Sequence, residues 1–137
     1  MLVYLAARYS RRTEIKAFVP LLAENHIKVR SRWLDETLPP EHELSQVTPQ
    51  SSRNSASDDI EDIEACDTLV LFSEDPTIGV PRGGRHVEFG YALAKGKRIV
   101  VIGGQENIFH YLPQIVHYST VQSFLEAEAI SNELVAD

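Results

Sequence analysis

Short apolar runs alternate with helix-like patterns along the chain, and this alternation is what most restricts its fold. Residues 2–6 form a short apolar run typical of a buried parallel strand, residues 28–33 alternate as a second strand, and further strands are predicted at residues 68–72 and 98–102. The intervening segments carry helical periodicity, and a final helix capped by Ser119 is predicted to run to about Leu134. Parallel strands joined by helices form a sheet that is covered on both faces through right-handed crossovers. We therefore expect a single doubly wound α/β domain over residues 1–137, Rossmann-like or flavodoxin-like, with a five-stranded parallel sheet flanked by helices.

Three features punctuate this alternation. Residues 35–57 are rich in Pro, Ser, Gln and Glu and show no period, which predicts a long loop or lid. This loop is expected to end where Ser57 caps the next helix. Pro20 falls inside the first helical pattern, where it should kink or shorten the helix. Gly96 is expected to end the helix that precedes the strand at residues 98–102.

The composition limits the partners of the protein. A formal net charge of -7 argues against binding to a nucleic-acid polymer, which needs a basic face, and leaves small ligands open. The single cysteine, Cys66, excludes an internal disulfide framework, and its apolar neighbours predict a packed thiol. No apolar run is long enough to span a membrane, and the first residues lack the order of a secretory signal. These features predict a cytoplasmic protein that does not associate with membranes.

The segment PRGGRHVEFGYALAKGKRI, residues 81–99, contains the residue that points most directly to a function. Residues 87–94 are apolar on every side of the predicted helix except for Glu88, and a buried carboxylate is costly unless it is paired. Gly83 and Gly84 suit a tight turn into the helix, so Glu88 falls near the helix start, where the dipole stabilises an anion. Glu88 therefore suits an ionised nucleophile, although a carboxylate that only satisfies N–H groups at the helix start would give the same pattern.

The expected sheet has a ligand-binding rim. In a doubly wound sheet, ligands bind beyond the carboxyl ends of the strands, where the following helices begin. This rule places Asp58, Asp59 and Glu88 on the rim, and Asp67 at the opposite edge as a structural residue. The turn at residues 7–12 brings several basic side chains to the same rim, where a helix N-terminus favours an anion such as phosphate. A solvated basic turn is an equally good interpretation.

Three segments of the chain resemble the nucleoside 2-deoxyribosyltransferase superfamily, which includes deoxynucleoside 5′-monophosphate N-hydrolases and pyrimidine-nucleotide N-hydrolases. They are VYLAARYSRR, SDDIEDIEACDTLVLF and GGRHVEFGYALAKGKRIVVIG. The stretch EFGYA at residues 88–92 is similar to the family's Glu-Leu-Gly-Tyr-Ala, in which the Glu is the catalytic nucleophile. The resemblance covers most of the chain apart from residues 35–57.

The resemblance implies roles for individual residues. Glu88 would be the nucleophile, and Tyr4 would orient it through a hydrogen bond. Asp59 would act near the sugar and base in proton transfer, with Asp58 close enough to keep that assignment open. Relatives that act on monophosphates bind the phosphate at the first turn. Substrate-binding residues are therefore expected there at Ala6, Ala7, Arg8, Ser10 and Arg11.

Further binding residues are expected beside the nucleophile. Gly84, Arg85 and His86 border Glu88 and are predicted to contact the sugar or phosphate, while Trp33 at a strand end is predicted to stack on a base. The competing interpretations are a His86 bonded only to a loop and a Trp33 in the core. The five histidines are scattered without metal-ligand spacing, so we expect neither a metal nor a cofactor.

The activity implied by the resemblance is cleavage of the N-glycosidic bond of a (deoxy)nucleoside or its 5′-monophosphate through a covalent glycosyl-Glu88 intermediate. Water would complete hydrolysis, and a second base would complete transfer. Arg82 stands near the position where the transferase branch has an Asp, and the tail ends in a polar ELVAD, so hydrolysis is favoured. The alternatives are a base-exchanging 2-deoxyribosyltransferase and a non-catalytic nucleotide-binding sensor.

The implied partners are a small nucleoside or nucleotide substrate and further copies of the chain. Relatives form dimers or larger assemblies, and the segment FHYLP at residues 109–113 supplies apolar groups for such a homo-oligomer interface. Burial within one subunit would explain the same residues.

Overall fold

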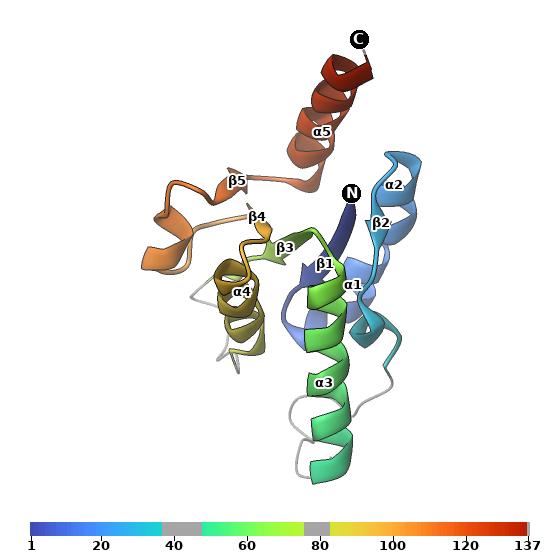
Figure 1. Ribbon diagram of the computed structural model, residues 1–137, viewed down its shortest axis with the longest axis vertical. Coiled ribbons are helices and arrows are strands. Elements are labelled where there is room, and N and C mark those ends of the chain that lie inside the picture. The colour runs from blue at the N-terminus through green and yellow to red at the C-terminus, as the bar shows by residue number, and fades with distance from the viewer. Residues whose placement is uncertain (37–47, 76–82, 137) are drawn as a thin grey trace.

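The computed structural model describes residues 1–36, 48–75 and 83–136, and Figure 1 shows how their elements are arranged. Five parallel strands form one sheet in the order β2-β1-β3-β4-β5. The strands are β1 (Leu2–Ala6), β2 (Lys28–Val29), β3 (Thr68–Phe72), β4 (Arg98–Ile102) and β5 (Val116–Tyr118). This is the flavodoxin-like order of a doubly wound sheet, and it confirms the expected α/β fold.

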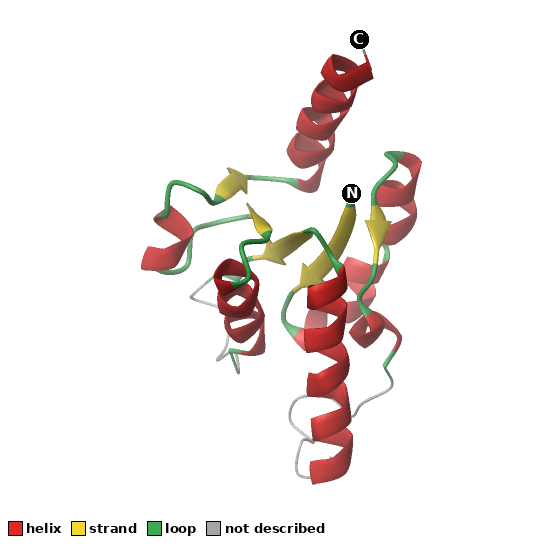
Figure 2. Ribbon diagram, in the orientation of Figure 1, coloured by secondary structure: helices red, strands yellow, loops and turns green. Residues whose placement is uncertain are grey.

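Helices flank the sheet (Figure 2). They are α1 (Arg12–Lys16), α2 (Val19–Glu24), α3 (Pro49–Ala65), α4 (Gly84–Ala94) and α5 (Val121–Ala136), with 3-10 helices η1 (Tyr9–Arg11), η2 (Arg32–Asp35) and η4 (Ile108–Tyr111). α3 and α4 contact each other and the central strands. Tyr4 pairs in register with Leu69 and bonds to α4, so both side chains face α4. Because strand side chains alternate, Phe72 faces the other way, where Phe18 stacks on it at 5.7 Å between ring centroids.

The central strands form the core. All five side chains of β3 are buried, as expected for a strand covered on both faces. Cys66 is also buried, and its thiol donates to the Arg30 carbonyl at 3.8 Å, which confirms the packed thiol. Asp67 accepts the N–H of Leu2 at 2.9 Å and therefore ties β1 to the start of β3, the structural role expected of it. Within the described residues, no helix combines the length and apolar character needed to cross a bilayer.

The second predicted strand is wrong in length. Residues 28–33 were expected to be extended, but β2 contains only Lys28–Val29 and the chain then turns into η2. Where a longer β2 would pair with the backbone of β1, the Ser31 hydroxyl instead accepts the N–H of Leu5 at 2.8 Å. The backbone N–H of Arg32 donates to the buried Asp62 carboxylate of α3 at 2.8 Å. These long-range bonds draw the chain out of the sheet.

The loop predicted at residues 35–57 is also wrong at its C-terminal end. α3 begins at Pro49, not at Ser57, and the side chain of Thr48 caps it by accepting the N–H of Ser51 at 3.1 Å. Residues 49–57 are thus helical, and Asp59 lies well inside α3 instead of at its start. Residues 37–47 of the predicted loop lie outside the described residues.

Smaller expectations about helix ends are mostly confirmed. Pro20 lies in the first turn of α2, and the first helical pattern is accordingly divided into α1 and α2. Gly96, at a φ of +71°, follows the end of α4 as expected. The cap of α5 is one residue later than predicted, because Thr120, not Ser119, accepts the N–H of Ser123 at 3.1 Å.

Gly103 directly follows β4 at a φ of +109°, in the left-handed region that favours glycine. A Cβ at this position would collide with the hydroxyl of Ser73, which follows β3. We expect Gly103→Ala to lower the free energy of unfolding by about 1–3 kcal/mol, because the conformation and the space both oppose a Cβ. Chemical denaturation measures this loss. Gly104→Ala is the matched control, since its Cβ would meet no atom of the described residues, and equal stability of the two variants would contradict the prediction.

Candidate active site

A cavity of about 410 Å³ opens beyond the carboxyl end of β1, between η2, α3 and α4. Its described lining residues are Ala7, Arg8, Tyr9, Trp33, Glu36, Ser55, Ala56, Asp59, Ile60, Gly83, Gly84, Arg85, Val87 and Glu88. The volume suits a ligand of nucleoside size. The position is the switch point of the sheet, where β1 lies between β2 and β3 and ligands bind in doubly wound folds.

Glu88 and Tyr4 meet at the inner wall of this cavity. Tyr4 is completely buried in β1, and its hydroxyl donates a hydrogen bond to Glu88 Oε2 in α4. Burial raises the pKa of Glu88 to about 8, the Tyr4 hydrogen bond lowers it, and the charges of Asp59 and Glu36 raise it further. Burial and the facing carboxylates also raise the pKa of Tyr4, so the phenol stays a neutral donor. The contact expected between Tyr4 and Glu88 is therefore present.

Asp59 faces the same cavity from α3. Its Oδ1 atom is buried and has no hydrogen-bond partner among the described residues. Burial raises the pKa of Asp59 to about 7, and the charges of Glu36, Asp62 and Asp58 add to the effect. Asp59 and Glu88 thus both exchange protons near neutral pH. The Tyr4 hydrogen bond lowers the pKa of both groups, so the two carboxyl groups titrate together, and one can carry a proton while the other is ionised.

Asp58 lies outside this arrangement. It is the neighbour that the sequence left open as an alternative to Asp59, but it does not line the cavity. Its Oδ1 instead pairs with Arg32 Nη1 at 3.4 Å, with about half of each side chain exposed. The geometry favours Asp59 for any chemistry inside the cavity.

The basic first turn only partly faces the cavity. Ala7 and Arg8 line it, whereas Ala6 is buried in β1 and Ser10 is exposed outside it. The guanidinium group of Arg11 is directed away from the cavity and bonds the side chains of Glu14 at 2.5 Å and Glu74 at 3.1 Å, together with the Ser73 carbonyl. Arg12 bonds the carbonyls of Leu34 and Glu36. The expectation that Ser10 and Arg11 bind substrate receives no support from this placement.

Trp33 serves the core and the cavity wall together. The side chain is buried, its indole Nε1 donates to the Leu5 carbonyl at 2.7 Å, and one part of it lines the cavity. The Tyr9 ring lies 6.3 Å away between centroids and lines the same wall. The two ring planes are tilted by 44° to each other, so each offers its own apolar face on which a base can stack.

The residues around Glu88 divide between two sides of α4. Gly84 and Arg85 line the cavity, and Arg85 is buried in an ion pair with Glu106. His86 is not a lining residue and lies beside Glu106 and the buried His110. The competing interpretation, a His86 directed toward a loop, fits this position better than contact with substrate.

His86, Glu106 and His110 form a group that the sequence did not predict, with candidate ligand atoms within 4.8 Å of one another. Two of its candidate ligand groups, the His110 ring and the Glu106 carboxylate, already have hydrogen-bond partners in the protein. The N–H of Glu106 donates to His110 Nδ1 at 3.1 Å, so Nε2 carries the ring proton, and Arg85 already binds the Glu106 carboxylate. Burial lowers the pKa of both histidines, so the rings are neutral neighbours of the Arg85–Glu106 pair.

Sequence reasoning missed several cavity residues. Those not predicted are Tyr9, Glu36, Ser55, Ala56, Ile60, Gly83 and Val87. Glu36 could have been found, because it follows the second strand at the carboxyl edge of the sheet, but it fell within the loop predicted at residues 35–57. Ser55 and Ala56 were hidden by the predicted loop, since only a helix that begins before them carries them to the cavity.

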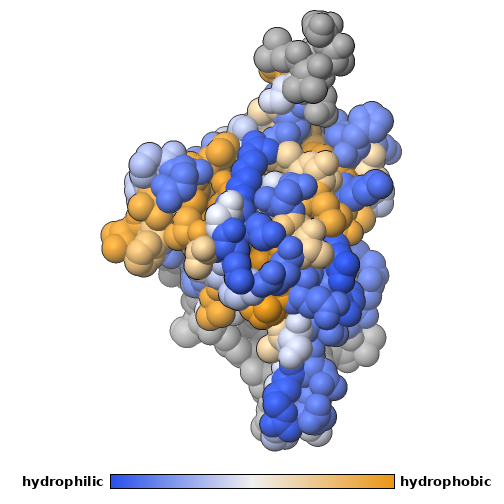
Figure 3. Space-filling model, in the orientation of Figure 1, coloured by the Kyte–Doolittle hydropathy of each residue, from blue (hydrophilic) through white to orange (hydrophobic). Residues whose placement is uncertain are grey.

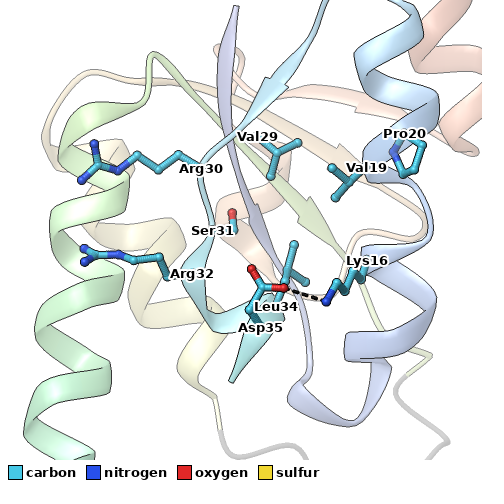
Figure 4. A pocket seen from close by; sticks show the side chains of 9 residues that line it. All are labelled: Lys16, Val19, Pro20, Val29, Arg30, Ser31, Arg32, Leu34 and Asp35. Carbon is cyan, nitrogen blue, oxygen red and sulfur yellow. Dashed lines mark ion pairs between the residues drawn. The ribbon is translucent and has the colours of Figure 1, made fainter. Parts of the chain in front are cut away.

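A second cavity of about 430 Å³ lies beside β2, α1 and α2 (Figure 4). Apolar side chains such as Val19 and Leu34 line it, and an ion pair between Lys16 and Asp35 at 2.6 Å stands at its side. The carboxyl groups of Glu88 and Asp59 do not reach this cavity. The candidate chemistry therefore belongs to the first cavity.

Solved structures of three enzymes are similar to this chain. A CMP N-glycosidase from Clostridium botulinum is 19% identical, with a TM-score of 0.58, and the match covers 93% of this chain and 97% of that protein. A 2-deoxyribosyltransferase from Bacillus psychrosaccharolyticus is 14% identical, with a TM-score of 0.70 and coverage of 91% and 90%. A 2-deoxyribosyltransferase from Leishmania mexicana is 19% identical, with a TM-score of 0.50 and coverage of 74% and 63%.

No family model matches the sequence, and no curated protein matches it. The likeness to the solved structures rests on the arrangement of the backbone at low sequence identity. The chain therefore shares its fold with this CMP N-glycosidase and these 2-deoxyribosyltransferases.

Proposed function

We propose that the protein cleaves the N-glycosidic bond of a (deoxy)nucleoside or its 5′-monophosphate through a covalent glycosyl-Glu88 intermediate. The observation that carries this proposal is the Tyr4–Glu88 hydrogen bond at the wall of a cavity that Asp59 also faces. The structural neighbours add support, because they are a CMP N-glycosidase and two 2-deoxyribosyltransferases.

The two carboxyl groups have complementary tasks in this reaction. The Glu88 carboxylate attacks C1′, the bond from C1′ to the base nitrogen breaks, and its electron pair leaves with the base. Asp59 gives its proton to the departing base, directly or through water. In the second step water attacks C1′, its proton passes to Asp59, and the bond from C1′ to Glu88 breaks. Tyr4 donates to Glu88 and orients the carboxylate that forms the bond.

We favour hydrolysis as the outcome of the second step, with base exchange as the alternative. Both begin with the same glycosyl-Glu88 intermediate and differ only in whether water or a second base captures C1′. The two 2-deoxyribosyltransferases among the structural neighbours keep base exchange in view. A nucleotide-binding sensor would need neither the Tyr4 bond nor the acid at Asp59.

The test is a substrate panel with product separation by chromatography. Nucleosides and 5′-monophosphates, in deoxy and ribo forms, are incubated with the protein with and without an acceptor base. Free base formed without an acceptor indicates an N-hydrolase, and a new nucleoside formed only with an acceptor indicates a transferase. Binding without turnover across the panel would contradict the proposed activity and favour a sensor.

We propose that the protein assembles as a homo-oligomer through η4. Figure 3 shows apolar surface at the side of the molecule where Figure 1 places η4. Ile108, Phe109 and Tyr111 are 78%, 53% and 67% exposed, an unusual grouping of large apolar side chains on a surface. His110 between them is buried, with its ring 5.1 Å from that of Phe89, so only part of residues 109–113 is available to a partner.

Phe109→Glu is expected to shift the protein from an oligomer to a monomer, because a charge at the centre of an apolar contact is costly to desolvate. Analytical ultracentrifugation measures the change. Ile130→Glu is the control, since Ile130 is 59% exposed on α5 and lies outside the proposed contact. A wild-type monomer, or an oligomer that survives Phe109→Glu, would argue against this interface.

The cytoplasmic location remains a prediction. The prediction rests on cysteine usage, because disulfide frameworks are typical of secreted proteins and a chain with one cysteine has no internal disulfide. That cysteine, Cys66, is free and buried.

A further inference from the structure

Glu36 is held in the cavity wall by bonds to its backbone. Its N–H donates to the Trp33 carbonyl at 3.2 Å, and its own carbonyl accepts from Arg12 and from the Tyr9 hydroxyl. None of these bonds uses the carboxylate. The backbone is thus anchored at three points, and the side chain remains available to the cavity that it lines.

The Glu36 carboxylate lies on the same side of the cavity as Asp59. Ser55, one helical turn before Asp59 on α3, donates a hydrogen bond to it. Because Glu36, Ser55 and Asp59 all line this cavity, the two carboxyl groups share one wall, and the charge of Glu36 raises the pKa of Asp59. Asp59 is the group that must reach the departing base in the proposed reaction. Since Ser55, the hydrogen-bond partner of Glu36, lies one helical turn before Asp59, we assign Glu36 to the part of the cavity that would hold the base.

The chemistry of this wall suits one feature of a nucleobase. A carboxylate accepts hydrogen bonds and donates none, so it attracts N–H groups and repels carbonyl oxygens. Trp33 and Tyr9 line the same cavity as Glu36. An aromatic face that stacks on a base leaves the edge of the base to be read by polar groups.

We propose that Glu36 selects the nucleobase by accepting a hydrogen bond from an exocyclic amino group, so that the cavity prefers amino-bearing bases to their carbonyl analogues. This inference rests on the proposed function, since the side of the cavity that holds the base is assigned from the role of Asp59. It concerns a residue that the family resemblance did not mark.

Two matched substrate pairs test the selection. Cytidine and uridine differ by an amino group in place of a carbonyl, and so do adenosine and inosine, on a different ring. The wild type is expected to show a higher kcat/KM for the amino member of each pair. Glu36→Gln should reduce both ratios by roughly tenfold or more, because an amide presents either a donor or an acceptor to the base.

Asp35→Asn is the matched control. It removes the same charge from the adjacent residue, but Asp35 is 74% exposed and pairs with Lys16 beside the second cavity. This variant should leave both ratios unchanged. If Glu36→Gln also leaves them unchanged, or if it changes the preference between deoxyribose and ribose instead, Glu36 does not select the base and the inference is overturned.

Equilibrium binding separates failure of this inference from failure of the proposed function. Calorimetry measures the binding of the same four nucleosides without any turnover. It is carried out on the single variant Glu88→Gln and on the double variant that combines Glu88→Gln with Glu36→Gln. Absence of base release from the wild type would reject the proposed reaction, while a binding preference for amino-bearing bases that depends on Glu36 would still support the selection. Equal binding of the paired bases to Glu88→Gln would reject the selection alone.

Discussion

Glu88→Ala is expected to reduce the rate of base release by about a thousandfold or more, because loss of a covalent nucleophile removes the reaction path itself. The fold should survive, since Glu88 is a partly buried carboxylate whose pKa is raised mainly by burial and whose removal relieves that cost. Release of free base from the best substrate of the panel, followed by chromatography, gives the rate.

Three measurements accompany this variant. Thermal unfolding and nucleoside binding establish that the variant is folded and retains the cavity. Glu126→Ala is the control for a general loss of charge, because Glu126 lies on α5 outside the cavity, where its Oε1 accepts a hydrogen bond from Gln122 Nε2 at 3.2 Å. Intact-mass measurement of the wild type with a slowly hydrolysed substrate should reveal a sugar adduct on Glu88. Base release by Glu88→Ala at a rate near that of the wild type would exclude Glu88 as the nucleophile.

Asp59→Asn is expected to lower kcat by about a hundredfold to ten-thousandfold, the usual contribution of a positioned general acid. An amide keeps the shape of the side chain but has no proton to give to the leaving base. Asp58→Asn is the matched control on the same helix, since Asp58 pairs with Arg32 and does not line the cavity. A larger loss in Asp58→Asn than in Asp59→Asn would reverse the assignment of the acid.

The pH profile gives a second, independent measurement of the same role. The proposed reaction requires Glu88 ionised and Asp59 protonated. The pKa values of Glu88 and Asp59 are raised to about 8 and about 7, so the pair holds a single proton mainly between these values, and the wild type should be most active there. Above this range Asp59 loses its proton and the rate falls. In Asp59→Asn that fall should disappear. The rising part of the profile should then follow the ionisation of Glu88 alone, whose pKa the Asp59 charge no longer raises.

The alternation of strands and helices could be predicted from sequence because it depends on local periodicity. β1, β3 and β4 have the predicted bounds, since a strand buried on both faces is a continuous apolar run. The EFGYA stretch marked Glu88 in the same way, as one carboxylate on an otherwise apolar helix. Tyr4 and Asp59 were assigned through the family resemblance, and the structure brings both to Glu88.

Hydrogen bonds and ion pairs between residues far apart in the sequence determined which other side chains reach the cavity. β2 ends early because Ser31 and Asp62 take the hydrogen bonds of Leu5 and Arg32, and neither pairing follows from local pattern. The same holds for Arg11, which is directed away from the predicted anion site by Glu74, a residue 63 positions later.

The sequence by itself determined the fold class, the alternation of strands and helices up to β4, and the carboxylate on which the proposed chemistry depends, because each follows from local residue spacing. Only the tertiary structure decided that Glu36 and Ser55 enter the cavity while Arg11 and His86 do not. The physical reason is that a charged side chain takes the partner that compensates its desolvation best, and that partner is supplied by whichever segment the fold brings beside it.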